Sequence, residues 1–306
     1  MIAAICPNPS VDKIYELDGI IPGSVNRCNI VRSYPGGKGV HVGLALNELG
    51  SETEIIGFWG GPTGNWVRNE CLSKGVPCSG PDLDEWTRTC ITILSNEKWQ
   101  NTEILETGPR ANNKNTTDFL SSVESSCKIS DAVCISGSWP EGIPLDIYHQ
   151  LHTFCKFHKT DLWVDASGEY LDAALKINPF GLHLNRHEAT QVLGEGFHPA
   201  EMCRILLNSC SVVALTDGAN GLYLGYNNQI FHGSCTVDKV ISSVGSGDCL
   251  TAGLLHAWYG GKSPAESAQI AVACGAANCI NPDLGMIQKA DVEYFAKQVI
   301  IKEFKA

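Results

Sequence analysis

A glycine turn followed by a carboxylate, Gly245-Ser246-Gly247-Asp248, precedes an apolar, helix-compatible run that reaches Tyr259. Glycines let successive amides point the same way, and the positive end of the following helix adds to them, so the turn suits an anion such as a phosphoryl group. A carboxylate beside a bound anion is unfavourable unless it performs proton chemistry, which indicates a general base. The alternative is an ordinary strand-to-helix turn that Asp248 caps.

A second glycine-rich stretch, Pro35-Gly36-Gly37-Lys38-Gly39, leads into a helical pattern that stops at Gly50. Its backbone amides could approach a ligand closely, and Lys38 could hold negative charge. Structural turns of this composition are common, so this stretch alone leaves both interpretations open.

The elements that must position these turns alternate along the chain. Residues 2–6 form a buried strand; after residue 131 we expect strands at 132–135, 162–164, 181–184 and 212–215, with helices at 144–157 and 169–175. This alternation predicts a mainly parallel, doubly wound α/β sheet with helices on both faces. Ligands bind at the carboxyl ends of such strands, so polar residues placed there should share one rim: Asp12, the 36–39 turn, Ser136, Asn185 and Asp217.

Other segments have their own signals. Residues 13–17 and 25–34 are β-favouring and flank the turn 21–24, which predicts a hairpin, and further strands are expected at 88–94 and 102–105. The polar segment 108–117 is typical of a loop. After Asp248 the pattern is helical to the end, with a break at 281–285.

Composition restricts the function. The 306 residues are sufficient for one large domain, and the net charge of -11 argues against nucleic acid or an anionic membrane as the main partner. The fourteen cysteines lie mostly in apolar runs without a C-x-x-C pair, which is typical of reduced thiols in a cytoplasmic enzyme. No apolar run is long enough for a membrane helix. We therefore expect a small-molecule site.

Several familiar motifs are excluded. The stretch Gly261-Lys262-Ser263 has His256 where a P-loop needs its leading glycine, and Leu250 stands where a Rossmann fingerprint needs its third glycine. A group of possible metal ligands, His149, His152, Cys155 and His158, lies on one predicted helix without a completing carboxylate. We interpret that group as a helix face.

Taken together, the two glycine turns resemble the ribokinase-like carbohydrate kinases of the phosphofructokinase B type. The 1-phosphofructokinase and tagatose-6-phosphate kinase branch is the most similar, because it shares several further motifs in the same order. These are Asn8-Pro9-Ser10-Val11-Asp12-Lys13, Pro22-Gly23-Ser24-Val25-Asn26-Arg27, Thr102-Glu103-Ile104, Ser136-Gly137-Ser138-Trp139-Pro140 and Cys274-Gly275-Ala276-Ala277.

The resemblance spans nearly the whole chain and implies a single ribokinase-like domain over residues 1–306, with a lid of strands from about 12–34 and 86–106. It implies transfer of the γ-phosphoryl group of MgATP to a hydroxyl of a phosphorylated ketohexose. Asp248 would be the general base, and the amides of Gly245, Ser246 and Gly247 would form the anion hole.

The resemblance also implies the binding residues. Asp12, Gly36, Gly37, His41 and Ser138 would contact the sugar, while Lys38, Arg27 and Arg88 would contact its phosphate. On the nucleotide side, Asn185 and Glu188 would order a hydrated Mg²⁺, with Glu188 acting through water. The remaining residues implied to bind the nucleotide are Thr216, Gly218, Gly221, Val272 and Ala276.

The chain departs from the branch pattern at several places. His41 and Cys90 replace asparagines, and His183-Leu184 replaces Lys-Pro before Asn185; smaller changes are Ser246 for Ala and Ser242 for Asn. The changes at His41, Cys90 and His183-Leu184 leave the identity of the sugar open. A kinase for an unphosphorylated sugar or nucleoside, or a non-catalytic sugar-phosphate-binding regulator, are the alternatives. We also expect a homodimer through the lid, because exposed strand edges need covering.

Overall fold

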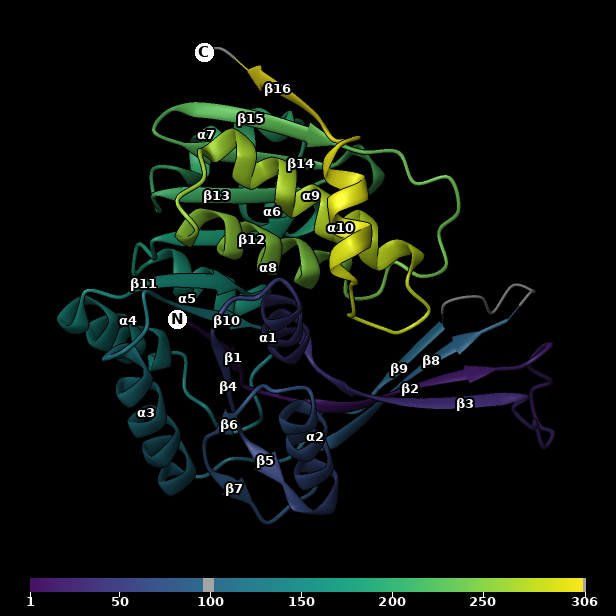
Figure 1. Cartoon of the computed structure of the whole chain (residues 1–306). Helices are drawn as coiled ribbons and strands as arrows, with labels where there is room; N and C mark the ends of the chain where they lie inside the picture. The colour runs from purple at the N-terminus through teal and green to yellow at the C-terminus, as the bar shows by residue number, and fades with distance from the viewer. Residues whose placement is uncertain (96–101, 305–306) are drawn as a thin grey trace.

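The computed structural model describes residues 1–95 and 102–304. Its centre is a ten-stranded sheet in the order β16-β15-β14-β13-β12-β11-β10-β1-β4-β6 (Figure 1). From β13 to β6 all neighbouring strands are parallel, which confirms the predicted mainly parallel sheet. The strands are β1 (Ile2–Cys6), β4 (Thr53–Gly57), β6 (Cys78–Ser79), β10 (Ala132–Ser136), β11 (Asp161–Asp165), β12 (Gly181–Asn185), β13 (Val212–Thr216), β14 (Leu222–Tyr226), β15 (Gln229–Ser234) and β16 (Ile300–Phe304).

Helices cover both faces of the sheet, as expected. Alternate residues of β1 feed the two cores: Ile2, Ala4 and Cys6 pack on one face, and Ala3 and Ile5 on the other. The first face is covered by α1 (Lys38–Glu48), α2 (Gly61–Ser73), α8 (Ser246–Tyr259), α9 (Pro264–Ile280) and α10 (Lys289–Ala296). The second is covered by α3 (Asn113–Cys127), α4 (Ile147–His158), α5 (Gly168–Leu175), α6 (Arg186–Leu193) and α7 (Pro199–Leu206). Within the described ranges, no helix is both long and apolar enough to cross a membrane.

The predicted all-helical end of the chain is wrong. Strand β16 pairs antiparallel with β15, with Ile230 opposite Phe304, and β14 and β15 form an antiparallel hairpin that we did not predict. The hairpin had a local signal, because Asn227 and Asn228 both adopt positive φ in its turn, as asparagine tolerates. The strand state of β16 depends on a distant partner, and its short sequence has no period that reveals it.

The predicted loop at 108–117 is also wrong at its carboxyl end, because α3 already begins at Asn113. Asn112 and Asn115 exchange side-chain hydrogen bonds with each other's backbone amides in a capping box. Helix α4 begins at Ile147 rather than at residue 144. Both differences arise at helix starts, where polar residues suit a cap as well as a loop.

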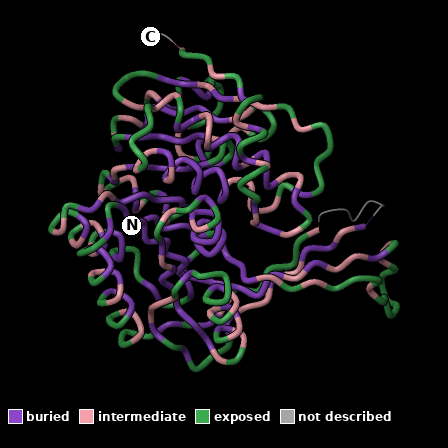
Figure 2. Tube along the Cα trace, in the orientation of Figure 1, coloured by how far each residue is buried: buried purple, intermediate pink, exposed green. Residues whose placement is uncertain are grey.

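A second sheet, which we call the lid, has the order β3-β2-β8-β9 and extends away from the main body (Figure 1). Its strands are β2 (Ser10–Glu16), β3 (Ile30–Gly36), β8 (Arg88–Leu94) and β9 (Thr102–Leu105), and a minor sheet pairs β5 (Trp59–Gly60) with β7 (Asp82–Leu83). The predicted hairpin exists as the antiparallel pair β2–β3, joined by residues 17–29. Figure 2 shows that the lid is buried at its base and exposed toward its far end.

Candidate active site

The glycine turn before α8 is tightly fitted. Gly245 is the N-cap of α8 with φ of 83°, and a Cβ there would lie 2.5 Å from the Cα of Gly285. Only glycine satisfies both the left-handed backbone and this close approach. Asp248 follows in the first turn of α8, and its side chain is buried. The turn thus brings the free amides of a helix start and a carboxylate together.

Asp248 contacts a histidine that comes from the other glycine stretch. His41 on α1 places its Nδ1 2.8 Å from Oδ2 of Asp248 and its Nε2 3.4 Å from Oδ2 of Asp12. The first contact is a hydrogen bond, while Nε2 lacks the alignment for one and makes an ion-pair contact. We call these three residues the acid–histidine cluster.

The second glycine stretch makes the cluster possible. Asp12 lies on β2 opposite the end of β3, and a Cβ on Gly36 would lie 2.1 Å from Cγ of Asp12. Glycine at this position therefore leaves the space that the carboxyl group occupies. Gly37 is the N-cap of α1, which then carries His41 one turn in.

Contacts within the acid–histidine cluster shift the pKa values of His41 and Asp12. Burial alone lowers the pKa of His41, but its contacts with the carboxylates of Asp12 and Asp248 outweigh that effect and raise the pKa from 6.5 to about 10. Burial raises the pKa of Asp12, yet the contacts with His41 and Ser10 bring it below its ordinary value. The Ser10 hydroxyl donates to Oδ1 of Asp12 at 2.6 Å.

A second charged group surrounds Asp165, which sequence reasoning missed. Lys38 Nζ lies 3.0 Å from Oδ1 of Asp165, while His183 Nδ1 lies 3.3 Å from Oδ2 and the Ser136 hydroxyl donates to Oδ2 at 2.8 Å. Burial raises the pKa of Asp165, but the charge of Lys38 and then that of His183 lower it well below its usual range. The signal was a carboxylate directly after an apolar strand, at the rim that ligands use.

The residues implied to bind the sugar phosphate are not all together. Arg88 begins β8, opposite Ser10, and its guanidinium donates to the backbone carbonyls of Asn8 and Glu106. Ser138 lies beyond β10, where its hydroxyl accepts a hydrogen bond from the Asn8 amide at 3.4 Å. Arg27 instead lies exposed in the connection between β2 and β3, beyond the Glu16 end of the strand that carries Asp12.

The residues implied to bind the nucleotide lie farther along the rim. Asn185 ends β12 opposite Thr216 on β13 and forms a reciprocal capping box with Glu188. Gly218 and Gly221 both have positive φ in the turn after β13. Val272 and Ala276 are buried on α9, which packs closely against α8.

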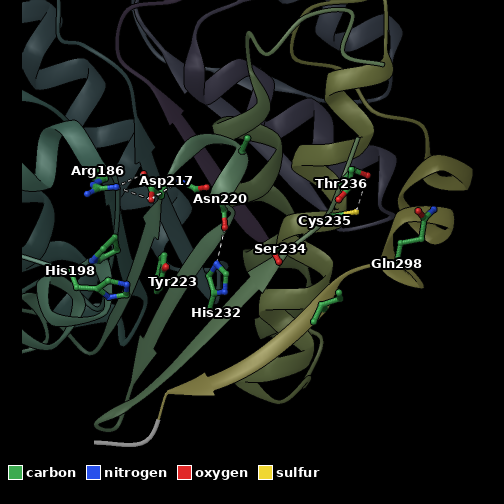
Figure 3. Close-up of a pocket in the computed structure, with 13 residues that line it drawn as sticks. Arg186, His198, Asp217, Asn220, Tyr223, His232, Ser234, Cys235, Thr236 and Gln298 are labelled. Atoms are coloured by element: carbon green, nitrogen blue, oxygen red, sulfur yellow. Dashed lines mark hydrogen bonds and ion pairs between the residues drawn. The ribbon is translucent and has the colours of Figure 1, made fainter. Parts of the chain in front are cut away.

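A pocket of about 670 Å³ adjoins this turn (Figure 3). It is lined by Asp217, Ala219 and Asn220, which lie between Thr216 and Gly221 in the chain, on either side of Gly218. Arg186 forms an ion pair with Asp217 at 3.2 Å within it. Of the residues that we predicted from sequence, Asp217 lines this pocket, whereas the residues implied to bind the nucleotide do not, so the pocket lies beside the candidate nucleotide site.

Comparison with known proteins identifies the family. The model of the pfkB family carbohydrate kinases matches residues 7–285. The 1-phosphofructokinase of Bacillus subtilis is 27% identical, with 98% of this chain and 97% of that protein covered. The tagatose-6-phosphate kinase of Staphylococcus epidermidis is 28% identical, with 99% and 100% covered.

Solved structures of several kinases have a fold similar to that of this chain. A putative phosphofructokinase from Staphylococcus aureus has a TM-score of 0.85 at 26% identity over the whole of both chains. Phosphofructokinase-2 from Escherichia coli has a TM-score of 0.90 at 24% identity, with 97% of this chain and 98% of that chain covered. A ribokinase from Thermotoga maritima has a TM-score of 0.79 at 17% identity, with 97% and 99% covered, and so shares the fold.

The fold and these matches define a carbohydrate kinase, an enzyme that transfers phosphate to a sugar hydroxyl. The chain belongs to the pfkB family of carbohydrate kinases. ATP is the phosphate donor that such a family implies.

Proposed function

We propose that this enzyme transfers the γ-phosphoryl group of ATP to a hydroxyl of a phosphorylated ketohexose, with Asp248 as the general base. The acceptor classes are fructose 1-phosphate, tagatose 6-phosphate and fructose 6-phosphate, two of which correspond to the relatives' names. The observation that carries the proposal is a buried carboxylate in the first turn of α8, directly after a glycine turn. Nothing in a purely structural cap requires the carboxylate to lie beside His41.

The chemistry follows from this arrangement. Asp248 accepts the proton of the attacking hydroxyl, the hydroxyl oxygen bonds to the γ-phosphorus, and the bond from that phosphorus to the bridging oxygen of ADP breaks. The amides of Gly245, Ser246 and Gly247 at the start of α8 stabilise the charge on the transferred group. The Ser246 amide also donates to the carbonyl of Ser243 at 3.1 Å, so Gly245 and Gly247 are the better donors of the three. Asp12, Gly36, Gly37, His41 and Ser138 hold the sugar.

Charge supports a phosphate on the acceptor sugar. Arg88 lies beside Asp12, where its charge contributes to the lowered pKa of that carboxyl, and its remaining N–H groups are suited to a phosphate. Lys38 supplies a second positive charge, and its pKa is raised because Asp165 stabilises the ammonium. Both groups lie on the sugar side of the candidate site.

The residues at the end of β12 fit a hydrated Mg²⁺. The chemistry of the donors is suitable, since Asn185 and Glu188 offer hard oxygens. Within the described residues, no group of three or more histidine, cysteine or acidic side chains could hold an ion directly. The ion would therefore be held by phosphate oxygens and water, with Glu188 contacting that water. When bound, it neutralises charge on the triphosphate. Thr216, Gly218, Gly221, Val272 and Ala276 would hold the nucleotide.

A homodimer through the lid is part of the proposal. Ile21, Val25, Val31 and Ile104 are large apolar side chains exposed on the lid, with exposures of 65%, 80%, 55% and 54%. Exposed apolar side chains of this kind are typical of a protein–protein interface. Arg27 lies in the same outer part of the lid, so a second copy is one means of bringing it to a phosphate. Sedimentation velocity of the purified protein tests this, and a monomer at micromolar concentration would contradict it.

A reducing compartment such as the cytoplasm is supported by the thiols. All fourteen cysteines are free, and the Sγ atoms of Cys127 and Cys155 lie only 3.7 Å apart in the core. An oxidising environment would favour a bond between such neighbours.

The test is ADP release with MgATP and each of the three sugar phosphates and their unphosphorylated parents. We expect turnover with one sugar phosphate and a loss of about 10²- to 10⁴-fold in Asp248→Asn. Asp291→Asn is the matched control, because Asp291 occupies the same first-turn position on another helix, α10, and should leave kcat unchanged. Full turnover by a folded Asp248→Asn variant would refute the assignment of the base.

A further inference from the structure

His41 is proposed above to contact the sugar, and its position in the acid–histidine cluster indicates a second role. It is 3% exposed, and its ring lies between two carboxylates from different elements, Asp12 on β2 and Asp248 on α8. Backbone encloses the ring as well: a Cβ on Gly285 would lie 2.2 Å from its Cδ2, and one on Gly245 would lie 3.5 Å from its Nδ1. The ring therefore has little freedom to turn away from either carboxylate.

The two contacts define the protonation of the ring. A neutral imidazole carries one N–H, so it can donate to one carboxylate only and must present a lone pair to the other. A lone pair facing a carboxylate in a buried site is repulsive. With Nδ1 at 2.8 Å from Asp248 and Nε2 at 3.4 Å from Asp12, the doubly protonated ring donates a hydrogen bond to Asp248 and presents an N–H rather than a lone pair to Asp12 in an ion-pair contact.

We propose that His41 is a positioning residue that, as an imidazolium, holds Oδ2 of Asp248 and links it to Asp12, so that Oδ1 of Asp248 accepts the sugar proton. This inference rests on the proposed role of Asp248 as the base. The Nδ1–H bond fixes the plane of that carboxyl group. Among the described residues, no hydrogen bond to Oδ1 is seen, which leaves this oxygen for the substrate hydroxyl.

The charges around the ring are consistent with this assignment. On the lid, the charge of Arg88 on β8 acts on Asp12. Burial, and to a smaller extent the charge of Asp12, raise the pKa of Cys90 on β8 and of Glu103 on β9. On α1, the charge of Asp165 and then that of Asp248 raise the pKa of Lys38. Lys38 itself is paired with Asp165, so His41 is the cation in direct contact with both carboxylates of the cluster. The raised pKa of His41 agrees with the geometry.

The same geometry couples the two substrate functions of the site. Oδ1 of Asp12 accepts a hydrogen bond from Ser10, and its Oδ2 faces His41. A sugar that binds to Asp12 therefore contacts the residue that faces the His41 ring, and that ring in turn holds Asp248. Replacing the ring by a neutral amide should remove its charge while retaining one donor.

The first experiment follows the His41 ring by NMR in the purified enzyme. We expect its imidazole resonances to keep protonated shifts from pH 6 to pH 9, and to titrate within that range in Asp248→Asn. His256, which lies on α8 and is hydrogen-bonded to Ser51, is the internal reference and should be neutral at pH 8. A wild-type His41 ring that loses its proton near pH 6.5 would overturn the proposal, whatever the enzyme's substrate.

The second experiment compares kcat and KM at pH 7 for wild type, His41→Asn and His256→Asn. A base that is no longer held in place should lower kcat by roughly tenfold or more in His41→Asn, with little change in KM for ATP. His256→Asn should match wild type in both constants. A folded His41→Asn variant with wild-type kcat would refute the positioning role.

Discussion

The fit of Gly245 against Gly285 makes a strong prediction for Gly245→Ala. An added methyl group would meet the Cα of Gly285 at 2.5 Å, whereas carbon atoms in contact lie about 3.5 to 4.0 Å apart. One backbone must therefore move by roughly 1 Å. The left-handed φ of 83° adds a conformational penalty of about 1 to 2 kcal/mol. Overpacking adds about 1 to 3 kcal/mol, so Gly245→Ala should lower the free energy of unfolding by roughly 2 to 5 kcal/mol.

Gly261→Ala is a matched control at the other end of the same helix. Gly261 has φ of 77°, close to that of Gly245, but nothing lies within 4 Å of its added Cβ. It should lose only the conformational part, about 1 to 2 kcal/mol. Urea unfolding of both variants at pH 7 measures the difference. Equal losses in the two variants would refute the argument from the close approach.

Activity separates the two variants further. A displacement of about 1 Å in the anion turn should lower kcat by about 10²-fold in Gly245→Ala, measured well below its unfolding transition. Gly261→Ala should keep wild-type kcat, because its helix end is away from the turn. If Gly245→Ala kept full kcat, the glycine turn would not contribute to transition-state stabilisation.

Three further substitutions test other parts of the site. Arg88→Ala should raise KM for the sugar phosphate by tenfold or more with little change in KM for ATP; equal KM values before and after would favour an unphosphorylated acceptor. Glu188→Gln can keep its capping bond to the Asn185 amide, so it should raise the Mg²⁺ concentration needed for half-maximal rate without changing the melting temperature. Asp165→Asn should cost about 2 kcal/mol at pH 7, because it removes a charge-assisted hydrogen bond while Lys38, whose side chain is 43% exposed, stays partly hydrated. The folded pKa of Asp165 is lowered, so its stabilisation is present above the unfolded value of about 3.9 and declines as the pH falls below it; urea unfolding at pH 7 and pH 3 should show the difference shrink.

Sequence patterns predicted those parts of the fold that depend on local order. The strand and helix alternation after residue 131 defines the parallel half of the sheet, and the segments 88–94 and 102–105 coincide with β8 and β9. Strand β16 was missed because its state depends on pairing with β15, about seventy residues earlier in the chain. Periodicity within a short segment carries no information about such a partner.

The candidate site, like the fold, could be predicted only where its signal is local in sequence. Both glycine turns are local signals, so Asp248 was identified as a candidate from the residues themselves, and the family resemblance added His41. That His41 bridges Asp12 and Asp248 could not be predicted, because the contact joins three separate elements. Asp165 was overlooked since its importance lies in Lys38 and His183, which approach it from α1 and β12.

The hydrogen bond between His41 and Asp248 spans 207 positions of the chain. A growing polypeptide therefore contains the sugar-side carboxylate and the histidine long before it contains the base, and no partly synthesised chain can hold a complete site. The α1 and α8 helices pack directly against each other on the same face of the sheet, and because they lie so far apart in sequence we expect this bond to close late in folding. Catalytic activity therefore requires that α8 has been synthesised and has folded against α1. A truncated product that ends before α8 would be inactive however well its earlier elements fold.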